Sequence, residues 1–348
     1  MRNSSVPRGL CWSCDDAPGI RRVGTAPRFH YVGVHGKRVR HEATLARIRG
    51  LVLPPAWTDV WISPSPWGHI QATGRDARGR KQYRYHAQWR AHRDADKYER
   101  MLVFGRALRR IDREVDADLR LPGLPRDRVL AVVVRLLELT HARVGNEKYA
   151  RSNGSFGLTT LRGRHVRVRG EHVTFHYKGK SGKARVFDVR DEQLARIVRR
   201  CDDLPGQHLF EYVDAGGRVH RVASHDVNAY IRRLSGGEFS AKDFRTLAGT
   251  VLAARALRQR PPCASRAQVV RAVREVVGEV SKRLGNTVAV CRKSYIHPAV
   301  FAAYETASLA PERAKRKDSR AHQVAAVLRA IERRAFVREE EVLVPLAG

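Results

Sequence analysis

The chain is organised around residues 284–298, which read LGNTVAVCRKSYIHP. The tyrosine in this stretch, Tyr295, stands between a basic pair and a His-Pro turn, and Asn286 lies nine residues upstream. Gly285 precedes that asparagine and has the position of a glycine that ends a helix. Most tyrosines are half-buried packing residues with a polar tip. Together with the basic clusters elsewhere in the chain, however, the surroundings of Tyr295 favour a nucleophile that attacks a phosphate.

The charge of the chain indicates a polyanionic partner. Its 348 residues include 67 Lys and Arg against 35 Asp and Glu, which gives a formal net charge of +32. Such a charge destabilises a compact protein by self-repulsion unless a polyanion neutralises it, and nucleic acid is the usual one. A GC-rich genome would explain a preference for Arg over Lys, but not the shortage of acidic residues. The hydrophobic content of 43% is normal for a globular protein, and the length suits two or three domains.

No targeting segment is evident, and the cysteines are typical of a reducing compartment. The sequence has no apolar stretch of signal-peptide length and nothing near the ~20 apolar residues of a membrane span. We therefore expect a soluble, intracellular protein. A lone Cys-x-x-Cys pair cannot complete a four-ligand zinc site, which favours free thiols. The cysteines are Cys11, Cys14, Cys201, Cys263 and Cys291.

The first part of the chain predicts a small β-rich domain. Between residues 28 and 85, short strand-like stretches are separated by turn signals. A short helix over 42–49 interrupts them, and residues 1–25 read as a loose polar leader. We expect this domain to end near residue 95. The strongest strand signals are residues 29–34, 60–63 and 69–73.

Residues 74–86 mix basic side chains with an amide and aromatic rings. Basic groups can neutralise phosphates, while amides and flat rings can meet base edges or sugars. A solvated, charged hairpin is the alternative, but the net charge of the chain favours contact with DNA. The candidate contacts are Arg80, Lys81, Gln82, Tyr83 and Tyr85.

From about residue 95 the periodicity becomes helical. Helices are expected over 98–115 and 125–141, and the second has a core-facing stripe of apolar residues at three- and four-residue steps. This helix leads to Arg143, which stands two residues before a glycine. An arginine held at a helix end can point at a phosphate, although arginines often decorate helix C-termini.

A three-stranded region follows, with strands over 165–169, 173–177 and 184–189. The turn at 178–183 is rich in lysine and invites comparison with a phosphate-binding P-loop. That motif would need glycine where Thr174 stands, and no helix follows the turn, so no ATP site is predicted here. The turn is better explained as a flexible hairpin that presents lysines to a nucleic-acid backbone.

The remaining signals are helical. Ser240 is a plausible N-cap, which places Arg245 in the first turns of a helix, near the positive end of its dipole. A valine stripe predicts a helix that stops at Gly285. A basic run at 313–317 belongs to a tail without an assigned function. The expected helices are 191–200, 225–234, 241–258, 265–284 and 322–334.

Five motifs occur in order along the chain. They are RVGNE at 143–147, GKSGK at 179–183, KDFRT at 242–246, LGNT at 284–287 and RKSYIHP at 292–298. This series resembles the type IB DNA topoisomerases, specifically the small poxvirus and bacterial form, over about residues 25–305. The resemblance implies a monomer that clamps duplex DNA between two domains.

The fold implied by this resemblance is α+β. A β-rich N-terminal domain (1–95) would precede a mostly helical catalytic domain (96–348) of the tyrosine recombinase and topoisomerase IB type. That second domain would contain a small three-stranded sheet and a basic, helical tail from about residue 306. The bacterial members imply a cytoplasmic, nucleoid-associated protein.

The resemblance also implies the chemistry. Tyr295 would attack DNA to form a 3′-phosphotyrosine and free a 5′-hydroxyl. Arg143 and Arg245 would hold the phosphate oxygens with bidentate guanidinium forks. Lys180 would protonate the leaving 5′-oxygen, assisted by Arg143. Asn286 stands where poxvirus members carry His, so it can donate a hydrogen bond but cannot titrate near neutral pH.

Neither a metal ion nor ATP is implied. The cationic side chains would replace Mg²⁺, and the phosphotyrosine would conserve the bond energy for resealing while the free strand end swivels. The resemblance points to Gln82, Tyr83, Tyr85 and Lys148 as DNA contacts, and Lys242 lies in a matching motif. Arg84 stands where poxvirus members place an aromatic residue, so their base preference does not transfer.

Two alternatives remain open from the sequence. A tyrosine recombinase uses a similar Arg, Lys, Arg and Tyr set, but it usually has His where Lys242 stands here. A non-enzymatic, basic nucleoid-binding protein would explain the charge, but not five ordered motifs. Covalent trapping on DNA separates the second alternative from both enzymes.

Overall fold

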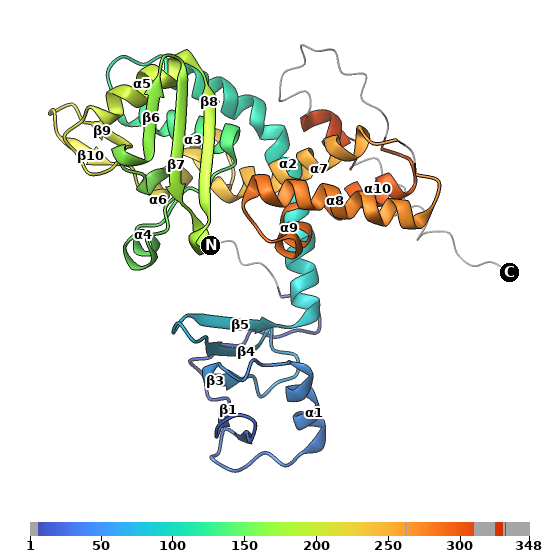
Figure 1. Ribbon diagram of the computed structural model, residues 1–348. Coiled ribbons are helices and arrows are strands. Elements are labelled where there is room, and N and C mark those ends of the chain that lie inside the picture. The colour runs from blue at the N-terminus through green and yellow to red at the C-terminus, as the bar shows by residue number, and fades with distance from the viewer. Residues whose placement is uncertain (1–5, 262, 310–323, 330, 332–348) are drawn as a thin grey trace. The chain divides into compact units, whose positions relative to one another are not determined.

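The fold is taken from a computed structural model, which describes residues 6–261, 263–309, 324–329 and 331. The chain divides into two compact units, Met1–Glu99 and Arg100–Gly348 (Figure 1). The helix α2 (Ala87–Leu119) runs through the division. It begins eleven residues before the expected start at residue 98, because the polar residues at its beginning carry no apolar periodicity to mark them as helical.

The first unit contains a five-stranded antiparallel sheet in the order β2-β1-β3-β4-β5, together with the helix α1 (Glu42–Gly50). Its small core consists of Ile20, Ile48, Val60, Ile62 and Ala72. The strand bounds are β1 Ile20–Val23, β2 His30–Val32, β3 Thr58–Ile62, β4 Ile70–Arg75 and β5 Lys81–Tyr85.

The expectation of a loose leader over residues 1–25 is wrong. The strand β1 lies inside the sheet, between β2 and β3, and Ile20 is buried in the core. Further upstream, the Ser13 hydroxyl donates to the Ile70 carbonyl at 2.9 Å and accepts from the Ile70 amide at 3.0 Å. These are partners from distant parts of the chain, so local composition could not indicate them.

The second unit is mostly helical and is built around α3 (Arg126–Thr140). The predicted apolar stripe of α3 is confirmed, but the helix is buried on almost every side, because α5, α6, α7 and β9 all pack against it. Even Glu138 is only 3% exposed, and it forms an ion pair with Arg135 at 3.2 Å. A buried carboxylate requires such a partner.

The expected three-stranded sheet is confirmed, in the order β6-β7-β8. Its strands are β6 (Val166–Arg169), β7 (His172–Lys178) and β8 (Ala184–Arg190), and a short 3₁₀ turn over Lys180–Gly182 joins the last two. A second, two-stranded sheet, β9 (Glu211–Val213) with β10 (Val219–Arg221), was not expected from the sequence.

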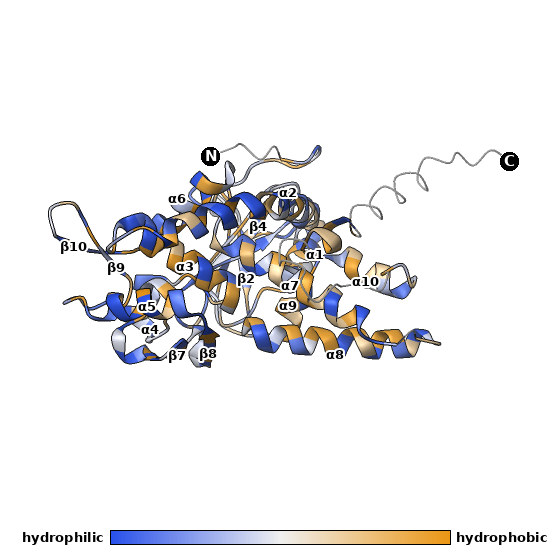
Figure 2. Cartoon of the chain, turned by 90° about the horizontal axis from the view of Figure 1, so that it is seen from above, coloured by the Kyte–Doolittle hydropathy of each residue, from blue (hydrophilic) through white to orange (hydrophobic). Residues whose placement is uncertain are grey.

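The helices after the sheet surround α7 (Ala241–Arg258), which contacts α3, α6, α8, α9 and α10. Along α8, hydrophobic and hydrophilic residues alternate, and the valine stripe faces the core (Figure 2). Gly285 ends α8 with a left-handed φ of 63°, as expected. The other helices are α4 Glu147–Asn153, α5 Glu192–Asp202, α6 Ser224–Ser235, α8 Arg266–Leu284, α9 Val288–Tyr295 and α10 Pro298–Glu305.

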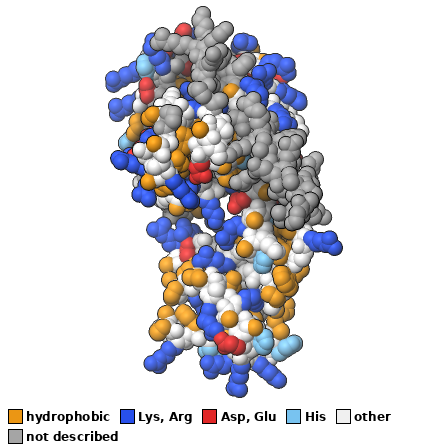
Figure 3. Space-filling model, turned by 90° about the vertical axis from the view of Figure 1, so that its right-hand side faces the viewer, with side chains coloured by type: hydrophobic (Ala, Val, Ile, Leu, Met, Phe, Trp, Pro, Cys, Tyr) orange, Lys and Arg blue, Asp and Glu red, His pale blue; other side chains and the backbone are white. Residues whose placement is uncertain are grey.

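Two expectations concern the tail. The basic run at 313–317 lies outside the described residues. Of the helix expected over 322–334, residues 324–329 and 331 are described, and they are helical. Elsewhere, Lys and Arg side chains are spread over the face drawn in Figure 3, with few Asp and Glu among them. Within the described ranges, no helix is both long and apolar enough to cross a membrane.

Candidate active site

Arg245 is the most deeply buried cation of the site. Only 4% of this residue is exposed, and its two terminal nitrogens donate to the His141 and Leu284 carbonyls, the latter at 2.8 Å. The guanidinium carbon lies 5.3 Å from the centre of the Tyr295 ring. A buried guanidinium needs hydrogen-bond acceptors, and here the ends of α3 and α8 supply them. Arg245 therefore joins two helix ends to the tyrosine.

Arg143 lies beside this group, in the loop after α3. One of its terminal nitrogens donates to the Asn286 side-chain oxygen and, at 3.3 Å, to the Gly285 carbonyl. Burial, with the nearby positive charge of Arg245, lowers the pKa of Arg143 to about 10. Among the described residues no carboxylate pairs with Arg143, which is the condition expected of a pocket for phosphate.

The loop that carries Arg143 is fixed by the chain that follows α4. The Leu158 amide donates to the Arg143 carbonyl at 3.0 Å, and the Thr159 amide donates to the Val144 carbonyl at 2.7 Å. A Cβ at residue 157 would lie 2.6 Å from the Arg143 carbonyl oxygen, so only Gly157 allows the two segments to approach so closely.

The orientation of Asn286 follows from its neighbour. Arginine has only donors, so the amide oxygen of Asn286 must face Arg143 and its nitrogen must face away. That nitrogen is buried and has no hydrogen-bond partner among the described residues. A buried donor without a partner is uncommon in native proteins and indicates a missing acceptor.

Tyr295 is the last residue of α9, and α7 holds its backbone. The Thr250 hydroxyl is fully buried; it accepts from the His297 amide at 3.0 Å and lies 3.4 Å from the Tyr295 carbonyl oxygen. At the preceding residue of α7, a Cβ on Gly249 would lie 2.4 Å from the Tyr295 carbonyl oxygen. The position of the tyrosine therefore depends on a residue without a side chain in α7.

Lys180 stands apart from the other four predicted catalytic residues. It is exposed on the turn between β7 and β8, and among the described residues no contact joins it to Arg143, Arg245, Asn286 or Tyr295. The following residue, Ser181, has a left-handed φ of 63°. The structure thus brings four of the five predicted residues together.

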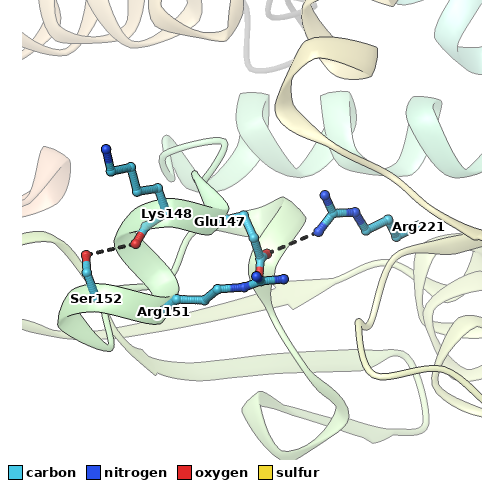
Figure 4. A pocket seen from close by; sticks show the side chains of 5 residues that line it. All are labelled: Glu147, Lys148, Arg151, Ser152 and Arg221. Atoms are coloured by element: carbon cyan, nitrogen blue, oxygen red, sulfur yellow. Dashed lines mark hydrogen bonds and ion pairs between the residues drawn. The ribbon is translucent and has the colours of Figure 1, made fainter.

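Lys148 lies at an open depression of about 570 Å³ on the surface of the second unit (Figure 4). Its neighbour Glu147, the last residue of the RVGNE motif, accepts from Arg151 at 3.0 Å and pairs with Arg221 at 3.5 Å and His208 at 3.3 Å. Although burial opposes it, hydrogen bonds from Arg151 and His208 lower the pKa of Glu147. Glu147 therefore fixes α4 and leaves Lys148 exposed.

In the first unit, acidic residues hold several of the predicted DNA contacts. Arg80 and Gln82 both bind Asp76, at 2.6 and 2.9 Å, and Lys81 binds Asp15 at 2.6 Å. The hydrogen bond from Arg80 lowers the pKa of Asp76 to about 2. These three side chains therefore already bind acidic residues within the protein.

Tyr83 and Tyr85 remain available on the edge strand β5. Their rings are stacked, 5.8 Å apart and 9° from parallel, and 42% and 39% of these residues are exposed. Alternation along the strand puts Gln82 on the other face. Lys242, in the first turn of α7, is also exposed.

One group of possible metal ligands, Cys14, Asp15 and Asp16, is found in the described part of the chain. Asp15 already accepts hydrogen bonds from Lys81 and from Thr73, and the group is mostly exposed. We assign no metal to it. The five cysteines are free thiols.

Sequence reasoning missed the residues that position the site, namely Gly157, Gly249, Thr250 and Arg185. Arg185 on β8 donates to the Lys282 and Arg283 carbonyls at 3.3 and 2.8 Å. Its sequence context is an ordinary strand alternation, so nothing local distinguishes it from the exposed arginines nearby.

Comparison with known proteins identifies the family. The sequence model described as "Eukaryotic DNA topoisomerase I, catalytic core" matches residues 86–333, and "Bacterial DNA topoisomerase IB, N-terminal domain" matches residues 28–76. The chain therefore belongs to the type IB DNA topoisomerases, and DNA is its substrate. This membership decides against the recombinase and the non-enzymatic binder.

Two relatives agree with this assignment. The DNA topoisomerase 1B of Acanthamoeba polyphaga mimivirus is 31% identical over 286 residues, which cover 80% of this chain and 85% of the viral protein. The DNA topoisomerase 1B of Vaccinia virus (strain Copenhagen) is 24% identical over 165 residues, 45% of this chain and about half (52%) of that protein. Among solved structures, the XerH site-specific recombinase bound to difH is 14% identical over 57% of this chain and 50% of its own, with a TM-score of 0.34, a likeness too weak to bear on function.

Proposed function

We propose that this topoisomerase relaxes supercoiled duplex DNA through a covalent bond between Tyr295 and a DNA 3′-phosphate. The observation that supports it best is the convergence of Arg143, Arg245 and the unpartnered amide nitrogen of Asn286 beside the Tyr295 ring. Three fixed donors around one tyrosine suit a phosphate whose negative charge grows in the transition state.

The cleavage step moves one proton at each end of the reaction. Tyr295 loses its hydroxyl proton to water as its oxygen bonds to phosphorus, and the bond from phosphorus to the 5′-oxygen breaks. The departing oxygen takes a proton from Lys180 and leaves as a 5′-hydroxyl. Religation is the reverse transfer, with the 5′-hydroxyl as the nucleophile and Tyr295 as the leaving group. Between the two steps the free end swivels and releases supercoils.

The two arginines have different roles in this proposal. Arg245 is buried and bound to two carbonyls, so it is a rigid donor to a non-bridging oxygen. Arg143 has a pKa of about 10 and can assist Lys180 in moving the proton. Asn286 donates through its amide nitrogen and takes no part in proton transfer, since an amide does not titrate in this range.

The reaction as written uses neither a metal ion nor ATP. Fixed cations stabilise the phosphate, and the energy of the cleaved bond is kept in the phosphotyrosine. Both absences remain predictions, and reaction in EDTA without nucleotide tests them directly.

The first unit, together with Lys148 and Lys242 of the second, is proposed to hold the duplex as a monomeric clamp. The stacked Tyr83 and Tyr85 rings offer a flat surface to sugars or bases, and Lys148 offers a charge to the backbone. When DNA binds, phosphates would compete with Asp15 for Lys81. The bacterial relatives of the N-terminal domain favour the nucleoid as the site of action.

The deciding experiment compares wild type with Tyr295→Phe on supercoiled plasmid in EDTA. Wild type should relax the plasmid through many linking states and leave protein bound to denatured DNA. Tyr295→Phe should bind the same DNA but do neither, because phenylalanine has no nucleophilic oxygen. A covalent adduct that survives in the mutant would contradict the assignment of the nucleophile.

A further inference from the structure

Arg185 lies between two glycines, each of which directly precedes a proposed active-site residue. Gly179 comes before Lys180, and Gly285 comes before Asn286. A Cβ at residue 179 would lie 2.9 Å from Arg185 Cγ, and a Cβ at residue 285 would lie 2.5 Å from Arg185 Nη1. The stem of the arginine therefore occupies the space beside the first glycine, and its head occupies the space beside the second.

The head of Arg185 binds the end of α8. Its two terminal nitrogens donate to the Lys282 and Arg283 carbonyls, which belong to the last turn of the helix. The Lys282 carbonyl also accepts from the Gly285 amide at 3.1 Å. A guanidinium fork can serve both carbonyls at once, whereas a lysine ammonium has no such fixed geometry. The last turn of α8 is thus joined to the strand β8.

The rest of the side chain is enclosed by aromatic rings rather than by acids. The guanidinium carbon lies 4.6 Å from the centre of the Phe187 ring. Burial lowers the pKa of Arg185, although the neighbouring Tyr177 hydroxyl opposes this shift. Among the described residues, no carboxylate pairs with it. A half-buried cation without an anionic partner is unfavourable for stability, so stability alone does not explain the presence of this arginine.

Among the described residues, the turn that carries Lys180 is held mainly at its base, where the Phe156 amide donates to the Lys178 carbonyl at 2.8 Å. Within the turn, the Gly179 amide donates to the Lys183 carbonyl at 2.8 Å, and the Gly182 amide donates back to the Gly179 carbonyl at 3.1 Å. These bonds close the hairpin on itself but do not fix its direction. The packing of Arg185 against Gly179 joins the hairpin to α8.

We propose that Arg185 is a positioning residue for the leaving-group proton. By tying the base of the β7–β8 hairpin to the last turn of α8, it directs Lys180 toward the phosphate held by Asn286, Arg143 and Arg245. This role rests on the proposed function of Lys180 as the general acid. Arg185 itself touches none of the reacting atoms.

The test compares two leaving groups in single-turnover cleavage of duplex DNA. One substrate has the native 5′-oxygen at the cleavage site, and the other has sulfur in its place. A thiol has a pKa of about 8.5, against about 16 for water, so a 5′-thiolate leaves without a proton. A defect in proton delivery should therefore vanish on the sulfur substrate, whereas a defect in phosphate binding or in folding should persist.

Arg185→Met should cleave the oxygen substrate on the order of 10²-fold more slowly than wild type, and the sulfur substrate within about threefold of it. Equal slowing on both substrates, or no slowing on either, would overturn the proposal. Arg190→Met is the matched control, since it removes an arginine of the same strand that pairs with Glu171; it should behave as wild type on both.

A second variant covers the possibility that Arg185→Met folds poorly. Gly179→Ala keeps the arginine but pushes its stem away, so it should slow cleavage of the oxygen substrate alone. Slowing of both substrates, or of neither, counts against the proposal. Lys180→Ala is measured in parallel, and sulfur should restore its cleavage. If it does not, the proposed function of Lys180 fails, whatever Arg185 does.

Discussion

Replacing Gly249 by alanine should move Tyr295, the proposed nucleophile, and slow DNA cleavage without unfolding the protein. The new Cβ would lie 2.4 Å from the Tyr295 carbonyl oxygen and 3.1 Å from Tyr295 Cβ. Ordinary contacts begin near 3.4 Å, so the end of α9 must shift by roughly 1 Å. A misplacement of about 1 Å in a reacting group costs on the order of 10²-fold in rate.

The stability of Gly249→Ala should change much less. Overpacking of a core costs about 1–3 kcal/mol, but alanine is about 1 kcal/mol better than glycine inside a helix. The net loss is therefore about 0–2 kcal/mol, which lowers Tm by at most about 8 °C in a domain of this size. Because the folded fraction stays near one at 25 °C, lost cleavage would report the position of Tyr295.

The assay is single-turnover formation of the covalent adduct, measured on denaturing gels, with Tm followed in parallel. Gly278→Ala is the matched control, because Gly278 also lies inside a helix but a Cβ there meets nothing within 4 Å. This control should gain about 1 kcal/mol and cleave as wild type. Cleavage by Gly249→Ala at the wild-type rate would refute the reasoning.

Three further outcomes are expected. Thr250→Val keeps the shape of the side chain but removes the hydroxyl that accepts from the His297 amide, so adduct formation should slow about tenfold. The Tm should also fall, because a buried amide without an acceptor costs about 1–3 kcal/mol. An unchanged rate would show that this hydrogen bond does not position the tyrosine. Arg143→Met should abolish efficient cleavage yet raise the Tm of the DNA-free enzyme slightly. Burial lowers the pKa of Arg143 to about 10, so the charged side chain destabilises the fold most at every pH below that value. The difference in Tm between Arg143→Met and wild type, measured from pH 7 to 10.5, should therefore shrink as the pH passes 10. A difference that grows with pH would contradict this sign. Lys148→Ala should reduce the log–log salt slope of DNA binding by about 1, one phosphate contact, whereas an unchanged slope would remove Lys148 from the interface.

Local signals predicted much of the second unit. The apolar stripe of α3, the strands of the β6–β8 sheet and the glycine that ends α8 all occur where the periodicity and capping patterns placed them. Such patterns lie within one helical turn or one hairpin, so they predict the local structure without information from the rest of the chain. The two-stranded sheet β9–β10 was too short to leave such a pattern.

Other structural features depend on contacts with distant residues, which no local sequence pattern predicts. The segment before residue 25 looked like a polar leader, yet Ile20 completes a core and Ser13 pairs with Ile70. Likewise, Lys81 looked like a free basic group, yet it binds Asp15, which lies far upstream in the chain. In both cases a polar or sparse segment gains its role from a distant residue.

The sequence by itself determined the family and predicted the kinds of groups in the proposed site, because five ordered motifs carry the tyrosine, the arginines and the lysine. Only the tertiary structure decided how these groups are held. The two terminal nitrogens of Arg245 are bound by carbonyls 39 and 104 positions away, and Arg143 sets the orientation of Asn286 from 143 positions away. Hydrogen bonds require short distances and correct angles in space, whereas a sequence records only order along the chain.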